Sequence, residues 1–343
     1  MAYTNTVLNR ARARLSQENE RKRAEYEDHL AKAYALRPRL REIDRSLRGT
    51  AAKLAALIFQ RDDPQAEIAR LRAENQALQD ERQWILDEAE LPEGFLDDSP
   101  VCSLCGGSGY RGSKMCECLR ELCRQEQKRE LASLLPTGRE RFENFSLELY
   151  PERFYPDYGA SARLLMQKNL NFCKKYAQDF QPGVRSLLFS GATGLGKTFL
   201  SACVARQVAE GGHSVVYVSA GKLFADYEAV RFERAEADSL RDYRDCELLI
   251  VDDLGTEMTT EFVKAALYEL VNGRLMEQKT TLISTNLDER HLEDRYGGQI
   301  ASRLLGSYRV IYFLGDDIRR KSRPQTAADP RQPSGGRAQQ IRV

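Results

Sequence analysis

The sequence predicts an α/β fold in which a parallel, doubly wound sheet follows a long helical segment. From about residue 183, apolar runs typical of buried strands alternate with helix-forming stretches. These runs are Leu187–Ser190, Val215–Ser219, Leu248–Asp252, Thr281–Thr285 and Val310–Leu314. The first run leads into a glycine-rich loop and the third ends in two aspartates. Ligands of such sheets bind beyond the carboxyl ends of the strands, where both features fall.

The glycine-rich loop is a phosphate loop of the pattern G-x-x-x-x-G-K-[ST]. Its residues are Gly191, Ala192, Thr193, Gly194, Leu195, Gly196, Lys197 and Thr198. Glycines let the backbone N–H groups face phosphate oxygens, and the following helix adds the positive end of its dipole. Lys197 is placed to reach the β- and γ-phosphates, and the Thr198 hydroxyl to help bind Mg²⁺. The loop therefore predicts a site for a nucleoside triphosphate.

The third strand has the pattern of a Walker B motif. Four apolar residues, Leu248 to Val251, bury the strand and present Asp252 and Asp253 at its tip. We expect Asp252 to bind Mg²⁺ and Asp253 to orient or deprotonate the attacking water. Glu257, four residues later, is a second carboxylate that could share this work.

Three further polar residues are candidates for contact with the phosphates. Asn286 follows the fourth strand, where an amide can bond the γ-phosphate, although a turn-forming asparagine is the competing interpretation. Arg303 and Arg319 are isolated arginines in apolar or acidic surroundings. An arginine supplied by a neighbouring subunit can speed phosphoryl transfer by about 10³–10⁵.

Composition is consistent with a soluble, cytoplasmic chain of several domains. It has 343 residues, a net charge of +1 and a mean hydropathy of −0.55. No apolar run reaches the roughly 18 residues of a membrane span, and the N-terminus has no signal-peptide core, so we expect no membrane partner. A net charge near zero neither indicates nor excludes binding of nucleic acid.

Residues 1–95 predict a helical coiled-coil hairpin. One apolar seam runs through Leu40, Ile43, Leu47, Ala51, Leu54 and Ile58, and a second through Ile68, Leu71, Asn75, Leu78 and Ile85. Asp62-Asp63-Pro64 separates them, and Arg82 occupies an otherwise apolar position. Two such helices favour an antiparallel pair, with Pro38 kinking or interrupting the first. A solvated spacer and a partner-binding arm remain equally open.

Residues 96–125 predict a small zinc-binding segment. Cys102, Cys105, Cys116 and Cys118 follow a C-x₂-C-x₁₀-C-x-C pattern that can close a tetrahedral Zn²⁺ site. The run 106–109 is rich in glycine and supplies the turn, and the segment has too few apolar residues to fold alone. The alternatives are free thiols or a redox pair, with Cys123 as a substitute ligand.

Four motifs, in this order, resemble the AAA+ ATPase domain of bacterial replicative helicase loaders of the DnaC/DnaI type. They are GATGLGKT, LLIVDDLGTE, TLISTN and SRLLG…GDDIR, within residues 140–321. IstB-like transposition helper ATPases are related to this family. The lead-in at 141–145, RFENF, also resembles the family segment that lines the adenine pocket.

The resemblance implies roles for the residues singled out above. The phosphate loop would bind ATP, and Asp252 and Asp253 would serve Mg²⁺ and hydrolysis. Asn286 would be sensor 1, Arg303 the arginine finger and Arg319 sensor 2. It also implies a five-stranded parallel sheet in the order 5-1-4-3-2, with residues 126–182 as linker and lead-in and 183–321 as the ATPase domain.

The same resemblance implies a hexameric replicative helicase and single-stranded DNA as partners, with self-assembly on the partner. Single-stranded DNA is typically bound by cationic side chains interleaved with aromatic ones. That mixture occurs at Lys222, Phe224, Tyr227, Arg231 and Phe232. Phe224 and Tyr227 also fit a position in the hydrophobic core. The segment from Arg319 to Val343 holds seven lysines and arginines against one aspartate, and residues 322–343 should be disordered. A transposition or phage-replication helper and a P-loop small-molecule kinase are the alternative functions.

Overall fold

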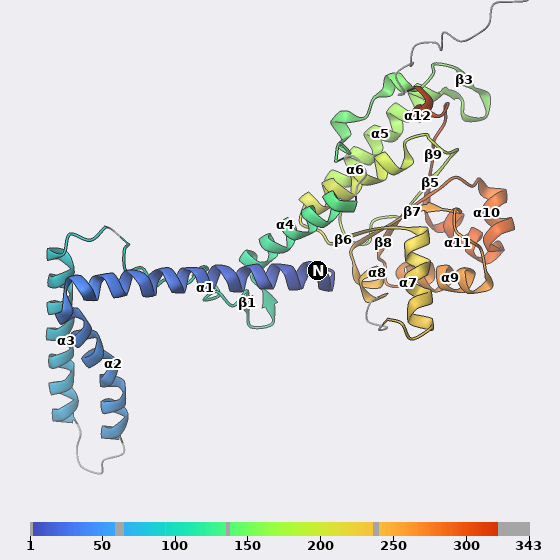
Figure 1. Cartoon of the computed structure of the whole chain (residues 1–343). Coiled ribbons are helices and arrows are strands. Elements are labelled where there is room, and N and C mark those ends of the chain that lie inside the picture. The colour runs from blue at the N-terminus through green and yellow to red at the C-terminus, as the bar shows by residue number, and fades with distance from the viewer. Residues whose placement is uncertain (1–2, 59–64, 93, 135–137, 236–239, 322–343) are drawn as a thin grey trace, which may run out of the picture. The chain divides into compact units, whose positions relative to one another are not determined.

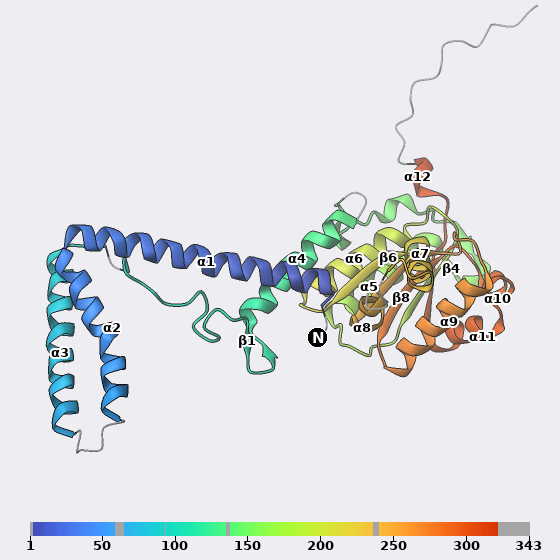
Figure 2. The ribbon, with the colours of Figure 1, turned by 60° about the horizontal axis from the view of Figure 1, so that its bottom comes forward.

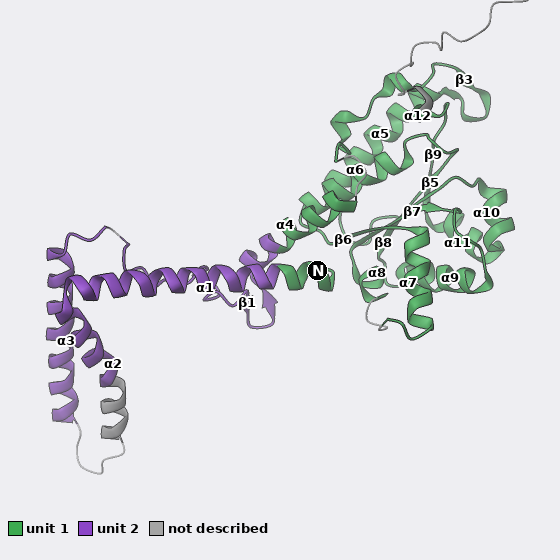
Figure 3. Cartoon of the chain, viewed as in Figure 1, with its two compact units in different colours: residues 1–10, 123–343 green, residues 11–122 purple. Residues whose placement is uncertain are grey.

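The computed structural model describes residues 3–58, 65–92, 94–134, 138–235 and 240–321, and the side chains of these residues except 51–58, 320 and 321. The chain forms two compact units, residues 1–10 with 123–343 and residues 11–122 (Figure 3). None of the helices in the described ranges combines the length and hydropathy that crossing a membrane requires. The predicted disordered tail, 322–343, lies outside the described residues.

The larger unit is built on a five-stranded parallel sheet (Figure 1). Its strands are β5 (Leu187–Ser190), β6 (Val215–Ser219), β7 (Leu248–Leu254), β8 (Thr280–Thr285) and β9 (Arg309–Tyr312). They lie in the order β6-β7-β8-β5-β9. Read from the other edge, this is the expected order 5-1-4-3-2, so the phosphate-loop strand β5 neighbours β8.

Side chains alternate between the two faces of these strands. Helices pack on both faces of the sheet, which Figure 2 shows from a second direction. One face packs on α5 (Ala162–Gln178) and α6 (Lys197–Glu210). The opposite face packs on a larger group of helices. That group comprises α7 (Ala220–Arg231), α8 (Arg241–Asp245), α9 (Glu261–Met276), α10 (Glu289–Tyr296) and α11 (Gly298–Ser307). Burial of both faces explains why the strands read as continuous apolar runs.

Side chains at the helix starts explain where several helices begin. Ser161, Ser219, Thr260 and Asp288 each accept a bond from the backbone N–H three residues later, at the start of α5, α7, α9 and α10. Such caps satisfy a donor that the helix itself leaves free. α6 has no side-chain cap, because its N-terminus follows the phosphate loop directly.

The segment before the sheet contains short elements that the sequence pattern did not predict. Two 3₁₀ turns, Phe142–Asn144 and Leu147–Leu149, precede a small antiparallel hairpin of β3 (Phe154–Tyr155) and β4 (Ala160–Ser161), and a third, Pro156–Tyr158, connects its strands. Two residues a strand are too few for a periodicity signal. After β9, the chain ends its described part in α12 (Ile318–Lys321).

The smaller unit contains the predicted helical pair, but with a break that makes three helices. α1 (Asn5–Leu36) ends before Pro38, which begins α2 (Pro38–Ile58), and α3 (Gln65–Glu88) follows. Proline suits the first position of a helix, where its missing N–H has no partner to lose. The interruption expected at Pro38 is therefore confirmed.

α2 and α3 pair antiparallel. Arg39 and Asp44, in the first part of α2, bond Glu81 and Arg82, whereas Thr50, further along α2, bonds Asn75, which lies earlier in α3. Leu40, Ile43, Leu47, Leu78 and Ile85 of the predicted seams belong to the core between them. The side chains of Ala51, Leu54 and Ile58 lie outside the described residues. Arg82 is tolerated in the seam because Asp44 neutralises it at 2.8 Å.

Candidate functional site

The phosphate loop connects β5 to α6, as its sequence predicts. Gly194 has φ +80°, and a Cβ there would lie 2.0 Å from the Asp317 carboxylate. The left-handed backbone angle favours glycine at this position, and a side chain would in addition have to displace the Asp317 carboxylate. The Ile318 N–H donates to the Gly194 carbonyl at 3.0 Å, so the segment after β9 packs on the loop.

Lys197 is 5% exposed and bonds its own loop. Its Nζ donates to the carbonyls of Gly191 at 2.6 Å and Ala192 at 2.8 Å. Burial lowers the pKa of Lys197, and the charges of Asp253 and Asp252 oppose that shift. The ammonium group is thus held at the mouth of the loop, where phosphate oxygens can replace the two carbonyls.

A pocket of about 460 Å³ opens beside this loop and joins segments far apart in the sequence. Its wall combines the loop from Thr193 to Thr198 with the lead-in residues Asn144, Phe145, Leu149 and Tyr150, and with Phe199. The Tyr150 hydroxyl donates to the Leu195 carbonyl at 2.8 Å, and Phe145 stacks on Tyr150. The lead-in therefore forms an apolar and aromatic wall next to the phosphate loop, suited to a flat base.

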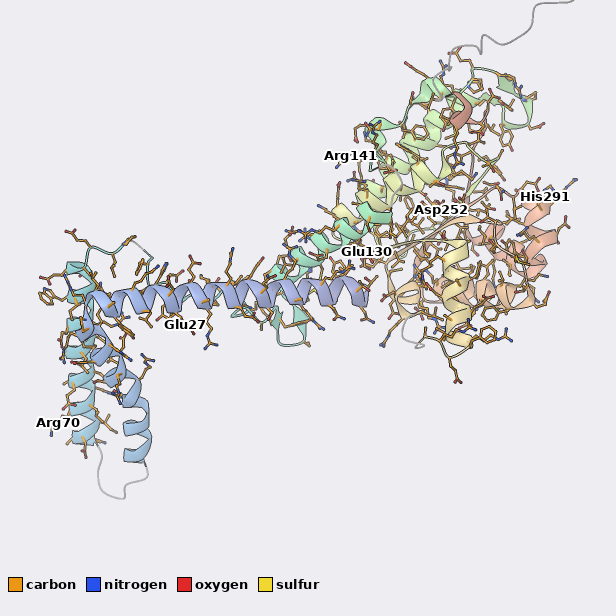
Figure 4. All side chains as sticks on the ribbon, in the orientation of Figure 1. Glu27, Arg70, Glu130, Arg141, Asp252 and His291 are labelled. Atoms are coloured by element: carbon orange, nitrogen blue, oxygen red, sulfur yellow. The ribbon has the colours of Figure 1, made fainter. Side chains whose placement is uncertain are left out.

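Asp252 (labelled in Figure 4) is 6% exposed and lies in β7, two residues before the end of that strand. Its Oδ1 accepts from the Thr198 hydroxyl at 3.3 Å and from the Ser284 hydroxyl. Its Oδ2 accepts from the Tyr217 hydroxyl at 2.9 Å. The structure thus brings together Thr198 and Asp252, two oxygen donors of the kind that Mg²⁺ binds.

Asp253 lines the pocket, one residue beyond Asp252. Its backbone is left-handed, with φ +57°, and its N–H donates to the Ser284 hydroxyl at 2.9 Å. Loss of hydration in the cleft, followed by repulsion from Asp252, raises the pKa of Asp253, and Lys197 and Arg319 oppose this. The turn directs the two consecutive carboxylates differently. Asp252 bonds side chains of the neighbouring strands, whereas Asp253 lines the pocket.

Glu257, the alternative carboxylate, is not among the residues that line this pocket. Its carboxylate accepts from the Gly255 N–H at 2.9 Å and from the Tyr296 hydroxyl. The Arg295 side chain bonds its backbone carbonyl. Glu257 thus holds the loop after β7 and is less available as a base than Asp253.

Asn286 and Arg319 both line the pocket, at the end of β8 and on α12. Arg303 does not. It lies on α11, where its guanidinium bonds the Asn272 side chain at 3.0 Å and the Tyr268 hydroxyl at 2.7 Å. Of the five residues that the sequence analysis proposed for phosphate chemistry, four therefore gather at one edge of the sheet, and Arg303 is held elsewhere in the same unit.

The segment proposed for single-stranded DNA divides into a core part and an exposed part. Phe224 and Tyr227 are buried against the sheet, so the competing core interpretation is right for both. Phe232 is 61% exposed, with the guanidinium groups of Arg231 and Arg234 over its ring at 5.9 and 5.7 Å. The exposed aromatic and cationic cluster at the end of α7 is thus smaller than the sequence pattern indicated.

The four cysteines of the predicted zinc segment converge in the smaller unit. The Sγ atoms of Cys102, Cys105, Cys116 and Cys118 all lie within 4.8 Å of one another. The Cys102–Cys116 and Cys105–Cys118 sulfur pairs are 3.9 and 3.5 Å apart. A tetrahedron with Zn–S bonds of about 2.3 Å has edges near 3.8 Å, so the spacing fits a four-thiolate site. Cys123 is buried and does not belong to this cluster.

Two local features bring the cysteine pairs together. A hairpin of β1 (Tyr110–Arg111) and β2 (Lys114–Met115) reverses the chain between Cys105 and Cys116. Gly107 has φ +81°, and a Cβ there would meet the Asn19 side chain at 2.4 Å. Burial raises the pKa of Cys105, but the Gly109 N–H and the neighbouring thiols outweigh it and lower the pKa to about 6. Burial and the same thiol contacts raise the pKa of Cys118, so without metal the thiolate, the form that binds metal, is favoured at Cys105 and not at Cys118.

Several residues of the nucleotide site escaped the sequence analysis. Tyr217 and Ser284 bond Asp252, and Tyr150 and Phe199 shape the pocket wall. Ser284 lies inside a predicted strand, two residues before Asn286, and a polar residue in an apolar run was the available signal. Tyr217 carried no such signal, because a tyrosine within a strand is ordinary.

Comparison with known proteins finds a family whose model matches part of this chain. Residues 159–326 match the family model for IstB-like ATP binding proteins. The replicative helicase loader DnaC of Buchnera aphidicola (subsp. Acyrthosiphon pisum) is 25% identical over 157 residues, 45% of this chain and 64% of that protein. DnaC of Escherichia coli K12 is 23% identical over 153 residues, 44% of this chain and 62% of the relative. The match thus spans less than two thirds of these relatives' own length.

Among solved structures, DnaI has a TM-score of 0.43 and 20% identity, covering 55% of this chain and 93% of DnaI. The DnaC helicase loader has a TM-score of 0.42 and 20% identity, covering 50% and 98%. The family match includes the phosphate loop, both aspartates, Asn286 and Arg319. Residues 159–326 therefore match the IstB-like ATP binding family, and this part of the chain is similar to replicative helicase loaders of the DnaC type.

Proposed function

We propose that this chain is an ATP-hydrolysing AAA+ helicase loader that acts with a hexameric replicative helicase on single-stranded DNA. One observation carries the hydrolytic part. A single pocket joins the phosphate loop to Asp253, Asn286 and Arg319, which come from separate elements. The similarity to DnaC proteins supports the loader part, because those relatives are named as replicative helicase loaders.

In this proposal each residue acts on the triphosphate at the edge of the sheet. Lys197 exchanges its two loop carbonyls for β- and γ-phosphate oxygens. Asp253 orients or deprotonates the attacking water, and Asn286 donates to the γ-phosphate. Arg319 places positive charge at the same pocket. Thr198 and Asp252 would hold Mg²⁺, which supplies positive charge that stabilises the phosphates.

The choice of partner can be tested by affinity capture. The tagged full chain should retain a purified hexameric replicative helicase more strongly with ATP than without nucleotide, and single-stranded DNA should join the complex. Capture of a transposase complex in place of the helicase would support the second candidate, an IstB-like transposition or phage-replication helper. The family-model match favours that candidate over a small-molecule kinase.

The contact with single-stranded DNA is proposed at the end of α7. There Arg231, Phe232 and Arg234 present an exposed ring between cations, on which a base can stack. Phe262 extends this surface, with the Arg231 guanidinium 4.8 Å from its ring centroid.

Replacement of Lys197 by alanine should weaken ATP binding by about 100-fold. Each charge-assisted hydrogen bond contributes about 1.5–3 kcal/mol. Loss of two such bonds to phosphate should therefore lower the ATP affinity by a factor of about 100 or more. Titration with a fluorescent ATP analogue measures the effect. Lys264→Ala is the matched control, because that lysine pairs with Glu261 on α9. Equal affinities of both variants would contradict the role of Lys197.

We further propose that Cys102, Cys105, Cys116 and Cys118 bind one structural Zn²⁺ per chain. The support is the convergence of four sulfur atoms in a loop with little apolar surface of its own. Four protein ligands complete a tetrahedral site, so this zinc would be structural and not catalytic.

Elemental analysis of protein purified without chelator should therefore find about one zinc per chain. Cys105→Ser should lose that zinc and destabilise the loop, because metal binding supplies its folding energy. Cys123→Ala should keep the zinc, since Cys123 lies outside the cluster. Zinc-free wild-type protein would reject the site, and zinc loss in Cys123→Ala alone would show that the ligand set is wrong.

A further inference from the structure

Tyr217 bonds a residue of the nucleotide site, and none of the sequence motifs includes it. It lies on β6, next to β7, and its ring packs with the side chains of the α6 face. Its hydroxyl lies 2.9 Å from Asp252 Oδ2 and 3.2 Å from the Ser201 hydroxyl. Ser201 in turn donates to the Thr198 carbonyl at 3.0 Å. Tyr217 therefore lies between Asp252 of β7 and the beginning of α6.

The direction of these bonds follows from the chemistry of the groups. An ionised carboxylate can only accept, so the single phenolic proton of Tyr217 goes to Asp252. A phenol has an ordinary pKa of about 10, so it keeps this proton at neutral pH. The Ser201 hydroxyl has one proton, which can go either to this Tyr217 oxygen or to the Thr198 carbonyl.

Together the donors fix the carboxylate of Asp252. Ser284 and Thr198 donate to Oδ1, while Tyr217 is the donor recorded at Oδ2. Without the Tyr217 hydroxyl, Oδ2 of this carboxylate, which is 6% exposed, would lose this donor, and the carboxylate could rotate more freely about its Cβ–Cγ bond. Ligands of a cation bind best when such outer partners hold their orientation.

We infer that Tyr217 is a positioning residue that orients Asp252 toward a hydrated divalent cation beside Thr198. This inference rests on the proposed function, since it presumes the Mg²⁺ site at those two residues. Tyr217 does not touch the nucleotide pocket and is absent from the residues that line it. Its effect is therefore confined to what the cation adds to nucleotide binding.

Binding of a fluorescent ATP analogue, measured in EDTA and across a Mg²⁺ titration, tests this directly. For Tyr217→Phe, which removes only the hydroxyl, affinity in EDTA should stay within about twofold of wild type. The Mg²⁺ concentration at half-effect should rise about 10-fold, in the range of 10–100-fold that loss of an outer partner costs a metal site. A residue that only supported the fold would weaken binding equally in both conditions.

Two further variants complete the experiment. Tyr176→Phe, which removes a hydroxyl bonded to the Arg185 carbonyl in the same unit, should leave the Mg²⁺ dependence unchanged. Ser284→Ala, which removes the donor to Oδ1, should shift it in the same direction as Tyr217→Phe. A folded Tyr217→Phe protein with the Mg²⁺ dependence of wild type overturns the inference alone. Nucleotide binding by wild type that ignores Mg²⁺ overturns the proposed cation site together with it.

Discussion

Replacement of Arg303 by alanine should abolish partner-stimulated ATP hydrolysis while ATP affinity stays nearly unchanged. Its guanidinium is bonded to Asn272 and Tyr268 of α9 and does not line the pocket of its own chain. An arginine finger that a neighbouring subunit supplies accelerates phosphoryl transfer by about 10³–10⁵, so the stimulated rate should fall by about 10³. ATPase assays with and without helicase and single-stranded DNA measure this fall.

The same variant distinguishes action in trans from a structural role. Mixed with a Walker B variant that keeps its own arginine, Arg303→Ala should regain part of the activity, because each chain supplies what the other lacks. Arg185→Ala is a suitable control, since that arginine bonds the carbonyls of Ser307 and Tyr308 at the end of α11. A mixture that assembles but stays inactive would contradict the assignment, as would an isolated monomer that hydrolyses ATP at the assembled rate.

The larger unit was predictable because its strands are buried on both faces. Such strands need continuous apolar runs, and the runs at 187–190 and 215–219 match β5 and β6 to the residue. The fourth run was placed one residue late, because Thr280 begins β8 although threonine is polar. The sheet order came from the family resemblance and not from the runs, which carry no information on neighbours.

The sequence could not supply the contacts between residues that are distant along the chain. Asp252 was assigned from its place after a strand, yet the residues that hold it, Tyr217 and Ser284, come from two other strands. The cation–aromatic pattern around Phe224 was likewise ambiguous, since helical periodicity buries one face of α7 and exposes the other. Only packing decides which aromatic residues of such a helix stay available.

Replacement of Asp253 by asparagine should give a protein that binds ATP but hydrolyses it about 10²–10⁴ times more slowly. Asparagine has nearly the same shape, so the left-handed turn and the N–H bond to Ser284 should persist. An amide cannot accept the proton of the attacking water, and general-base catalysis contributes a factor of this size. Single-turnover hydrolysis of bound ATP separates this loss from any change in affinity.

Glu257→Gln is the comparison that assigns the base. Glu257 accepts bonds from the Gly255 N–H and the Tyr296 hydroxyl, and it is absent from the pocket wall. Glutamine keeps one oxygen for these donors, so turnover should change far less than in Asp253→Asn. The reverse result, wild-type turnover in Asp253→Asn and slow turnover in Glu257→Gln, would make Glu257 the base. The loop after β7 would then have to release Glu257 from Tyr296 and Gly255 before hydrolysis, because a carboxylate that accepts both bonds is turned away from the pocket.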